Sequence, residues 1–441
     1  MYKLSSYNYF VKENNRYVYF NGITNHVFSL SENEHENIQR LLYDLISFEI
    51  NYNSVFKKFI DWGFVIEEDV DELDIVRYRN KLATIGNKAL NLVINPTLEC
   101  NFNCWYCYEE HPKGVMNQDT VDKIQKYIEH KVIKEHVSSV HISWFGGEPL
   151  LYFNEVVYPL SLFAKKICAS HNVPFNVSVT TNAYRIDKEM ITKMKEIDMK
   201  HFQITLDGAK KRHDKIRNEN GLPSYDRIMK NVNDLCKYIE DVHITLRINY
   251  DDKTLKDVQM KEIFSIIPVE YRAKILPNFQ RVWQTVKEGS LKNERRLDLY
   301  NYCRDIGFKV NEPANILQIG AYFKCYVDCF NHLEINYDGK LYFCTARTFT
   351  EEYEVGVLND DGTIRWHEQK VAKRYAKATF ENEMCIKCKY LPLCMGPCSQ
   401  KIMETPKEYL SSICSLKYSE IPPETVIVEY YKNKMKFLEE N

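Results

Sequence analysis

Three cysteines near residue 100 constrain this chain more than any other feature. They are Cys100, Cys104 and Cys107, spaced C-x3-C-x2-C. Three thiolates on one short loop can hold three irons of a four-iron, four-sulfur cluster and leave the fourth iron open. An open iron can bind a substrate and pass an electron to it. The triplet therefore indicates a one-electron redox enzyme. A zinc loop and chance clustering are the alternatives.

A second group of cysteines follows residue 324 and is large enough to hold further clusters. Its members are Cys325, Cys329, Cys344, Cys385, Cys388, Cys394, Cys398 and Cys414. In a reducing compartment, cysteine clusters are more often metal sites than disulfides. Two structural zinc sites are the competing interpretation, because C-x2-C pairs suit tetrahedral zinc.

Composition narrows the class of protein. The 441 residues are 44% hydrophobic and 27% charged, which is typical of a globular chain with two or three domains. The net charge of -2 gives no reason to expect a nucleic-acid partner. No apolar run approaches the roughly 20 residues that cross a membrane, and the start lacks a signal peptide. We therefore expect a cytoplasmic protein with no membrane partner.

Residues 90 to about 280 alternate between strand-like and helix-like segments. The expected strands are Asn91–Asn95, Val140–Phe145, Asn176–Thr180, His201–Leu206 and His243–Asn249. The expected helices are Asp119–His136, Asn154–Ser170, Asp187–Ile197 and Tyr225–Ile239. Such repetition predicts parallel βαβ units in a barrel or a doubly wound sheet, with the active site at the carboxyl ends of the strands. The cysteine triplet follows the first strand, at that end.

Residues 1–85 are expected to form a small separate unit. Aromatic alternation predicts a strand at Arg16–Phe20, followed by a turn at Asn21 and Gly22. Ser31 is a candidate N-cap for the next helix, and a later helix is expected to end at Gly63 before another strand. From Cys325 onward, the loop-rich sequence predicts a domain organised more by metal than by a large core.

The segment from Thr97 to Tyr108 reads TLECNFNCWYCY. It resembles the cluster loop of the radical S-adenosylmethionine (radical SAM) superfamily, C-x3-C-x-aromatic-C, with Tyr106 at the aromatic position. The resemblance implies that S-adenosylmethionine (SAM) chelates the open iron through its amino and carboxylate groups. One electron then cleaves the sulfonium to methionine and a 5′-deoxyadenosyl radical, which abstracts hydrogen from unactivated C–H bonds.

Further segments resemble other motifs of this superfamily. Gly146, Gly147, Glu148 and Pro149 are similar to its GGE motif, which binds the methionyl amino group, although a Gly-Gly turn alone is usually only a turn. Glycines here would let the backbone approach a ligand closely. The TNG-like segment near the ribose and a signature of one branch supply the remaining candidates, namely Thr181, Asn182, Thr205, Asp207 and Arg217. Asp207 and Arg217 can equally be a structural ion pair.

The cysteines after residue 324 resemble the SPASM domain of radical SAM enzymes, which holds two auxiliary four-iron clusters. Cys325 adds an eighth thiolate to the seven of that pattern, so protein ligands alone can close both clusters. The family's ligation implies a first auxiliary cluster on Cys325, Cys329, Cys344 and Cys398. It implies a second on Cys385, Cys388, Cys394 and Cys414, which makes three [4Fe-4S] clusters in total. Cys168, Cys236 and Cys303 are expected to be buried apolar residues.

SPASM-bearing enzymes mostly act on peptides or proteins. Phe145 before the GGE turn and Thr345 after Cys344 differ from the Gln and Asp that anaerobic sulfatase-maturating enzymes carry there. The sequence instead resembles sactipeptide- and ranthipeptide-type peptide maturases, which install thioether or carbon–carbon crosslinks. Segment 61–66 and the acids after it are similar to winged-helix domains that bind a precursor's leader as an added strand. Sulfatase maturation, maturation of a peptide-derived cofactor and a non-catalytic iron–sulfur relay remain alternatives, and a merely structural N-terminal unit remains possible.

The expected architecture is thus an α/β chain with a partial (β/α)6 barrel at residues 90–290. A winged-helix-like leader-binding unit precedes it at 1–85, a bridging region follows at 291–324, and a SPASM domain occupies 325–441. The expected partners are a ribosomally made precursor peptide and an electron donor such as flavodoxin or ferredoxin.

Overall fold

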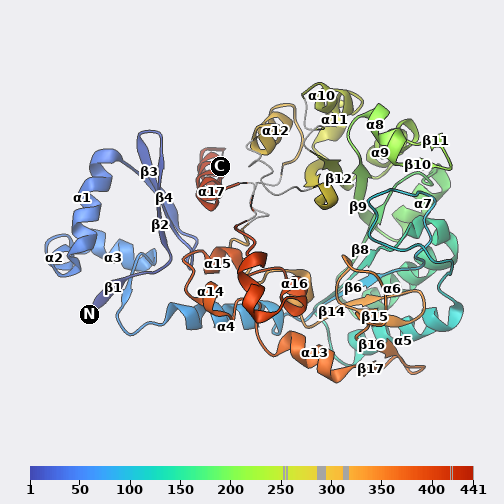
Figure 1. The fold of residues 1–441 in the computed structure, drawn as a ribbon, viewed down its shortest axis with the longest axis horizontal. Coiled ribbons are helices and arrows are strands. Elements are labelled where there is room, and N and C mark those ends of the chain that lie inside the picture. The colour runs from blue at the N-terminus through green and yellow to red at the C-terminus, as the bar shows by residue number, and fades with distance from the viewer. Residues whose placement is uncertain are drawn as a thin grey trace.

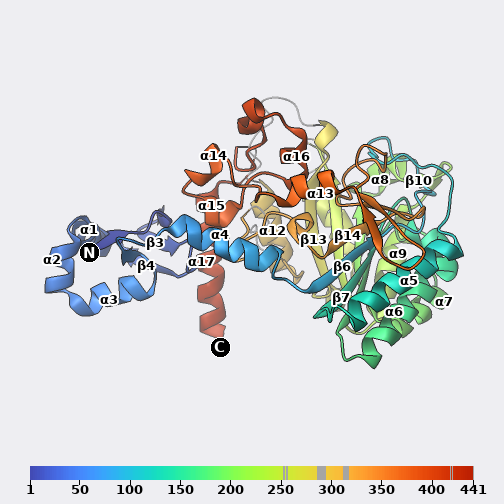
Figure 2. The same ribbon diagram turned by 90° about the horizontal axis from the view of Figure 1, so that it is seen from below.

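A computed structural model describes residues 1–251, 254, 257–285, 295–310, 317–417, 419 and 421–440. Its centre is a ten-stranded sheet in the order β13-β12-β9-β8-β7-β6-β14-β15-β16-β17. The sheet curves on one side of the molecule, and the N-terminal residues lie on the other side (Figure 1). Part of the C-terminal residues lies between the two (Figures 1 and 2).

Six neighbouring strands of this sheet are parallel and confirm the predicted βαβ repetition. They are β6 (Ala89–Ile94), β7 (Ser139–Trp144), β8 (Phe175–Thr181), β9 (Met199–Leu206), β12 (His243–Tyr250) and β13 (Ile275–Arg281). Their spatial order follows their chain order without reversal, as in a barrel and unlike a doubly wound sheet. β13 was not predicted, because Pro277 interrupts its apolar pattern. Proline is tolerated there because β13 lies at the edge of the sheet.

Helices cover the outer face of the parallel strands (Figure 2). They are α5 (Gln118–Ile133), α6 (Tyr158–Ser170), α7 (Lys188–Glu196), α8 (Lys210–Ile216), α9 (Tyr225–Tyr238), α10 (Asp257–Ser265), α11 (Val269–Arg272) and α12 (Arg295–Asp305). Leu90, Leu92 and Ile94 of β6 share a buried core with Ile124 and Ile128 of α5. Alternate residues of β6 must therefore face the opposite side, which is the barrel interior.

The predicted helix at 154–170 begins later than expected. The 3-10 turn η1 (Pro149–Tyr152) and the π turn η2 (Phe153–Val157) precede α6. Proline is tolerated at the start of η1 because the backbone N–H that it lacks would have no partner within the turn. The chain leaves the glycine turn through these two short turns before the regular helix begins.

The C-terminal residues extend the barrel sheet, which the sequence did not predict. β14 (His332–Ile335) pairs in parallel with β6, and β15 (Lys340–Tyr342), β16 (Gly356–Leu358) and β17 (Ile364–Trp366) continue as antiparallel strands. The segments around them are η5 (Tyr326–Asp328), α13 (Glu368–Tyr375), α14 (Glu383–Ile386), α15 (Leu391–Cys394), α16 (Ser399–Glu404), η6 (Lys407–Ile413) and α17 (Pro423–Glu440). The region after residue 324 is therefore joined to the barrel by backbone hydrogen bonds.

The N-terminal unit contains the antiparallel sheet β2-β3-β4 and the antiparallel pair β1-β5. Its elements are β1 (Tyr2–Leu4), β2 (Asn8–Glu13), β3 (Arg16–Asn21), β4 (Val27–Ser31), α1 (Glu32–Tyr43), α2 (Leu45–Asn51), α3 (Asn53–Asp61), β5 (Val65–Glu67) and α4 (Glu72–Thr84). Ser31 forms a capping box with Glu34, which confirms the predicted N-cap. Gly63 has a φ of 79° between α3 and β5, where the helix was expected to end.

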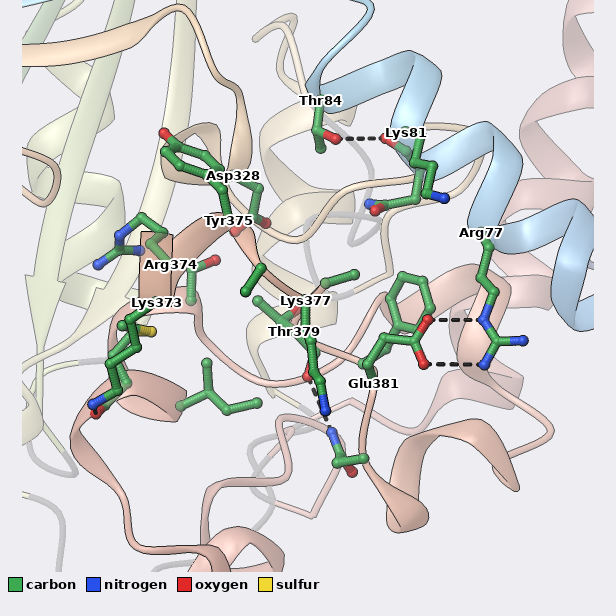
Figure 3. A pocket seen from close by; sticks show the side chains of 18 of the residues that line it. Arg77, Lys81, Thr84, Asp328, Lys373, Arg374, Tyr375, Lys377, Thr379 and Glu381 are labelled. Atoms are coloured by element: carbon green, nitrogen blue, oxygen red, sulfur yellow. Dashed lines mark hydrogen bonds and ion pairs between the residues drawn. The ribbon is translucent and has the colours of Figure 1, made fainter. Parts of the chain in front are cut away.

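The N-terminal unit packs on the C-terminal residues. Tyr9 donates a hydrogen bond to the carbonyl of Lys389, and Arg77 of α4 forms a bidentate ion pair with Glu381. A hollow lies between α4 and the segments around α13 and α16, with Arg77, Lys81, Lys373, Lys377 and Glu381 on its walls (Figure 3). In the described part of the chain, no helix is both long and apolar enough to cross a membrane.

Candidate active site at the carboxyl ends of the strands

The loop that follows β6 carries the cysteine triplet. The Thr97 hydroxyl donates to the carbonyl of Gly114 at 2.5 Å, and the Cys107 amide donates to the carbonyl of Cys104 at 2.9 Å. Burial raises the pKa of Cys100 to about 12 and also raises the pKa values of Cys104 and Cys107. The thiols thus stay protonated until a cation compensates their charge.

One protein cation acts on all three thiols. The guanidinium of Arg217 lowers the pKa of Cys100, of Cys104 and of Cys107, against the larger effect of burial. Three sulfurs on one loop, with the Arg217 guanidinium near them, are the donor set expected for an anionic iron–sulfur cluster.

The glycine turn after β7 packs directly on the cysteine loop. The Gly147 amide donates to the carbonyl of Thr97 at 3.3 Å, and the Glu148 amide donates to that of Glu99 at 2.8 Å. A Cβ on Gly147 would lie inside van der Waals contact of the carbonyl oxygens of Leu98 and Glu99, and Gly146 has a φ of 99°. From the sequence, we expected these glycines to let the backbone approach a ligand closely. In the structure, their observed close partner is the backbone that precedes Cys100.

Glu148 ties this turn to the next strand. Its Oε1 accepts hydrogen bonds from the Thr181 hydroxyl at 2.7 Å and the Leu150 amide at 3.1 Å, and its Oε2 accepts one from the Asn182 amide at 2.7 Å. The residue is 1% exposed. Pro149 follows it at the first position of η1. The structure thus brings the GGE-like turn, Thr181 and Asn182 together at the carboxyl ends of β7 and β8.

Tyr106 joins the cysteine loop to β9 and β12. Its hydroxyl donates to Asp207 Oδ2 at 2.6 Å and accepts from Arg217 at 2.8 Å and from Asn249 Nδ2 at 3.0 Å. Arg217 also forms an ion pair with Asp207. The ion pair that the sequence left open as a structural alternative is therefore present. Thr205 lies two residues before Asp207, buried and opposite Arg247 of β12.

Asp207 also receives support from a buried histidine. The Asp207 amide donates to Nδ1 of His213 at 3.2 Å, and the other ring nitrogen lies 3.0 Å from the Ser224 hydroxyl. Burial, assisted by Arg217, lowers the pKa of His213 from 6.5 to about 3. The ring is therefore neutral at neutral pH and holds the Asp207 backbone through an acceptor nitrogen.

We expect His213 to make the protein sensitive to acid. Below pH 6.5 the unfolded chain protonates this histidine, whereas the folded chain keeps it neutral down to about pH 3. The free energy of unfolding therefore falls as the pH drops through this window, by up to about 1.4 kcal/mol per pH unit, and is unaffected above it. Urea unfolding at about pH 7 and pH 5.5 gives the free energy of unfolding at each pH. The loss between the two pH values should be about 1 kcal/mol smaller in His213→Gln than in the wild type. An equal difference in both proteins would contradict the assignment.

Sequence reasoning missed two polar residues of this site. Asn249 donates to Tyr106, and Arg247 Nε donates to Asn249 Oδ1 at 3.0 Å. Both lie near the carboxyl end of β12, on the face whose polar residues alternate with Ile244, Leu246 and Ile248. Polar residues on that face close to the carboxyl end of a barrel strand were the available signal.

The C-terminal cysteines form two spatial groups. Cys385, Cys388, Cys394 and Cys414 line one cavity together with Met384 and Leu416. Burial raises the pKa values of Cys325 and Cys344, and the nearby Cys398 raises both further, while Cys344 also raises that of Cys325. These three thiols therefore lie near one another. The fourth residue of that expected set differs, because the Cys329 thiol points to the carbonyl of Ala83 at 3.9 Å.

The other cysteines behave as expected. Cys168, Cys236 and Cys303 lie on α6, α9 and α12, and all three are buried in the hydrophobic core of the barrel. Within the described ranges, no set of three or more His, Cys, Asp or Glu side chains is gathered closely enough to hold a single metal ion.

The comparison with known families decides the class of the barrel. Residues 94–259 match the Radical SAM superfamily. These residues form a radical SAM domain. They run from the last residue of β6 through β12 and include the cysteine triplet, the glycine turn, and Asp207 with Arg217.

The similarity to one curated relative extends beyond this radical SAM domain. The radical SAM cyclopropyl synthase TigE of Paramaledivibacter caminithermalis is 24% identical over 407 residues, which cover 81% of this chain and 80% of TigE. A serine-type anaerobic sulfatase-maturating enzyme of Bacteroides thetaiotaomicron is 26% identical over 165 residues, 34% of this chain and 37% of that enzyme.

Solved structures share the fold at low identity. SuiB of Streptococcus suis, bound to the precursor peptide SuiA, has a TM-score of 0.52 and 17% identity, and the match covers 94% of this chain and 100% of SuiB. The structure of anSMEcpe with bound AdoMet has a TM-score of 0.54 and 18% identity, covering 79% of this chain and 95% of anSMEcpe. The match to SuiB includes more of the chain than the radical SAM domain alone.

Proposed function

We propose that this protein is a radical SAM peptide maturase. It takes a ribosomally made precursor peptide, removes a hydrogen atom from a core residue and installs a thioether or a carbon–carbon crosslink. One observation carries the proposal: the GGE turn, the cysteine triplet and the Tyr106–Asp207–Arg217 cluster meet at the carboxyl ends of β6 to β9. In barrels, this end is the active-site end.

The residues present fit a cluster with SAM. Three thiols lie on one loop with Arg217 as a nearby cation, and one carboxylate oxygen of Asp207, Oδ1, is buried without a hydrogen-bond partner among the described residues. We assign the cluster to Cys100, Cys104 and Cys107, and SAM to the surface formed by the Gly146–Pro149 turn, Tyr106, Thr181, Asn182, Thr205, Asp207 and Arg217. When bound, the cluster and SAM supply a 5′-deoxyadenosyl radical that abstracts hydrogen from the substrate.

The chain's own residues position this chemistry. Glu148 holds the glycine turn against the start of the cysteine loop and fixes the Asn182 amide. Tyr106 fixes the other end of that loop through Asp207 and Arg217. Glu148 and Asp207 are buried, so the loop is held at two points before any ligand arrives. Such preorganisation is what positioning a short-lived radical beside one C–H bond requires.

Two auxiliary clusters are proposed for the C-terminal cysteines. The shared cavity of Cys385, Cys388, Cys394 and Cys414 supports the second set. For the first set, Cys325, Cys344 and Cys398 lie together, and Cys329 must turn from Ala83 to join them. Forming a crosslink releases one electron after the hydrogen abstraction, and a cluster fully closed by protein thiolates would relay that electron.

Replacing Cys325 tests the first auxiliary set. We expect Cys325→Ala to lose the iron of one cluster, because alanine has no atom that can bond iron in place of the thiolate. Iron and sulfide analysis after anaerobic reconstitution measures the loss. Cys303→Ala, which removes a buried helix cysteine, should keep the full iron content. Full iron content in Cys325→Ala would show that Cys325 is not a ligand.

The N-terminal unit is proposed to bind the leader of the precursor. Its sheet β2-β3-β4 has two edges at which an added peptide strand can pair. SuiB, whose match covers nearly the whole chain, is bound to its precursor peptide. Docking a leader there would raise the effective concentration of the core peptide at the barrel.

The genes that flank this one are to be searched for a short cysteine-rich open reading frame, whose peptide would serve as the test substrate. Reconstituted enzyme, SAM, a reductant such as flavodoxin or dithionite, and that peptide should yield a product lighter by two hydrogens, with the new bond located by tandem mass spectrometry. Conversion of a Ser or Cys to formylglycine in a sulfatase peptide, with the precursor unchanged, would replace this proposal by sulfatase maturation.

A further inference from the structure

The hollow between α4 and the C-terminal residues (Figure 3) is lined by an excess of cationic side chains. Its volume of about 580 Å³ lies in the size range of ligand pockets. Two carboxyl groups, Asp328 and Glu381, and six cationic groups line it, in a chain whose net charge is -2. The cationic residues are Arg77, Lys81, Lys373, Arg374, Lys377 and Lys407. The active site described above uses none of them.

Both carboxyl groups of the hollow already have partners. Arg77 donates to Glu381 through Nε at 2.8 Å and through Nη2 at 3.0 Å. Oδ2 of Asp328 accepts from the backbone amides of Lys324 at 3.1 Å and Cys325 at 2.9 Å. Glu381 therefore offsets the charge of Arg77, and only Asp328 is left to offset the other five cations.

The four lysines of the hollow form no ion pair in the part of the chain that the structure describes. They are Lys81, Lys373, Lys377 and Lys407, and all four are exposed. Lys373 Nζ donates only to the carbonyl of Met403, at 3.4 Å. Lysine is charged at neutral pH. Lys81 comes from α4, whereas Lys373 and Lys377 come from the C-terminal residues (Figure 3). The positive charge is thus spread over two walls.

A spread of this kind favours an extended anionic ligand over a compact one. A single phosphate is bound by donors that converge on one point, as at a helix N-terminus. The backbone amides of Lys377, Ala378 and Thr379, which also line the hollow, donate to no group among the described residues. Such amides can pair with the carbonyl groups of an extended peptide. A peptide with several carboxylates therefore fits the hollow better than a lone anion does.

Apolar side chains lie among the lysines. The hollow is also lined by Ile85, Phe380, Ile402, Met403 and Leu410. On α4, Tyr78, Leu82 and Ile85 follow one another at helical spacing and are 62%, 52% and 58% exposed. Exposed apolar groups that lie together mark contact surfaces. Because α4 runs from the N-terminal unit toward the barrel (Figure 2), this row leads from the proposed leader-binding unit to the hollow.

We propose that this hollow binds an acidic segment of the precursor peptide. Aspartate or glutamate side chains of the segment face the lysines on both walls, and an apolar side chain packs between them. The proposal rests on the proposed peptide-modifying function and defines the charge of its substrate. A segment held here is fixed between the N-terminal unit and the barrel, so the hollow adds a second point of attachment for the peptide.

The test measures binding of two probes to the reconstituted full-length protein. One probe is the acetylated peptide amide EELEE, and the other is QQLQQ, which has nearly the same shape but no charge. Calorimetry at low ionic strength should show about tenfold tighter binding of the acidic probe, because several exposed ion pairs form together. The preference should weaken as salt screens these pairs.

A charge-matched pair of variants locates the binding. Lys373→Gln with Lys377→Gln removes two exposed charges from the hollow and should abolish most of the preference. Lys195→Gln with Lys237→Gln removes two exposed charges from α7 and α9, outside the barrel, and should keep it. All four side chains are exposed, so both variants should fold.

The possible results separate the alternatives. Equal binding of both probes by the wild type would overturn the proposal, as would a preference that the two variants keep or lose to the same extent. Displacement of the acidic probe by an equal concentration of inorganic phosphate would assign the hollow to a compact anion instead. If the hollow variant keeps the preference but accepts electrons from flavodoxin more slowly, the hollow is a docking surface for the electron donor and the proposal fails.

Failure of the proposed function would be visible separately. Probe binding needs no turnover, whereas the function requires formation of 5′-deoxyadenosine by the wild type. Absence of that product with the probe preference intact would remove the function and leave an acidic-peptide site.

Discussion

Gly147→Ala is expected to abolish SAM cleavage while leaving the fold intact. The added methyl group would overlap the backbone carbonyl oxygens of Leu98 and Glu99, which cannot swing aside as a side chain can. The segment before Cys100 must then move, and the hydrogen bonds from Gly147 and Glu148 to Thr97 and Glu99 must lengthen. A displacement of about 1 Å at a catalytic group can reduce the rate about 100-fold.

The measurement is the yield of 5′-deoxyadenosine, together with iron bound per chain. Gly307→Ala is the control, because a Cβ on Gly307 meets nothing within 4 Å; Gly307 has a positive φ of 94°, which Gly147 does not. The control should lose about 1 kcal/mol of stability from backbone strain and keep its activity. Wild-type activity in Gly147→Ala would show that the turn and the loop are not packed as described.

Glu148→Gln is expected to reduce both stability and SAM binding. The carboxylate accepts from Thr181, Leu150 and Asn182, and an amide must turn one N–H group toward one of these donors. Losing one buried hydrogen bond to a charged group costs about 2 kcal/mol. The freed turn would also no longer hold Asn182, so we expect at least about tenfold weaker binding of SAM.

Glu354→Gln provides the matched control for this substitution. Glu354 is also buried, and it pairs with His367 and Lys340 on the antiparallel extension of the sheet. It should lose stability without weakening SAM binding. Thermal unfolding and equilibrium dialysis with labelled SAM separate the two effects. Equal SAM affinity in wild type and Glu148→Gln would contradict the role given to Glu148.

Local patterns predicted the elements of the barrel well because each pattern has one physical cause. Apolar alternation around Leu90 and Leu92 reflects a strand with one face against helices. Ser31 with Glu34 predicts a helix start because both side chains satisfy backbone amides. The position of the cysteine triplet just after the first predicted strand likewise placed the loop at the carboxyl end of β6.

Features that depend on distant partners were not predictable in the same way. Glu334 is near Asn95 only because β14 pairs with β6, across more than 230 residues of sequence. The glycines of the turn look like ligand-approach residues until their contact with the 97–99 backbone is seen. The Cys329 thiol, expected among cluster ligands, contacts Ala83 of α4, which lies outside the C-terminal region.

The formation of 5′-deoxyadenosine tests the central claim most directly. Anaerobically reconstituted protein, given dithionite and SAM, should produce it, and the variant with Cys100→Ala, Cys104→Ala and Cys107→Ala should not. The auxiliary cysteines remain in that variant, so the comparison isolates the loop after β6. Equal product from both proteins, or none from the wild type with its full iron content, would contradict the assignment of a SAM-cleaving cluster to this loop.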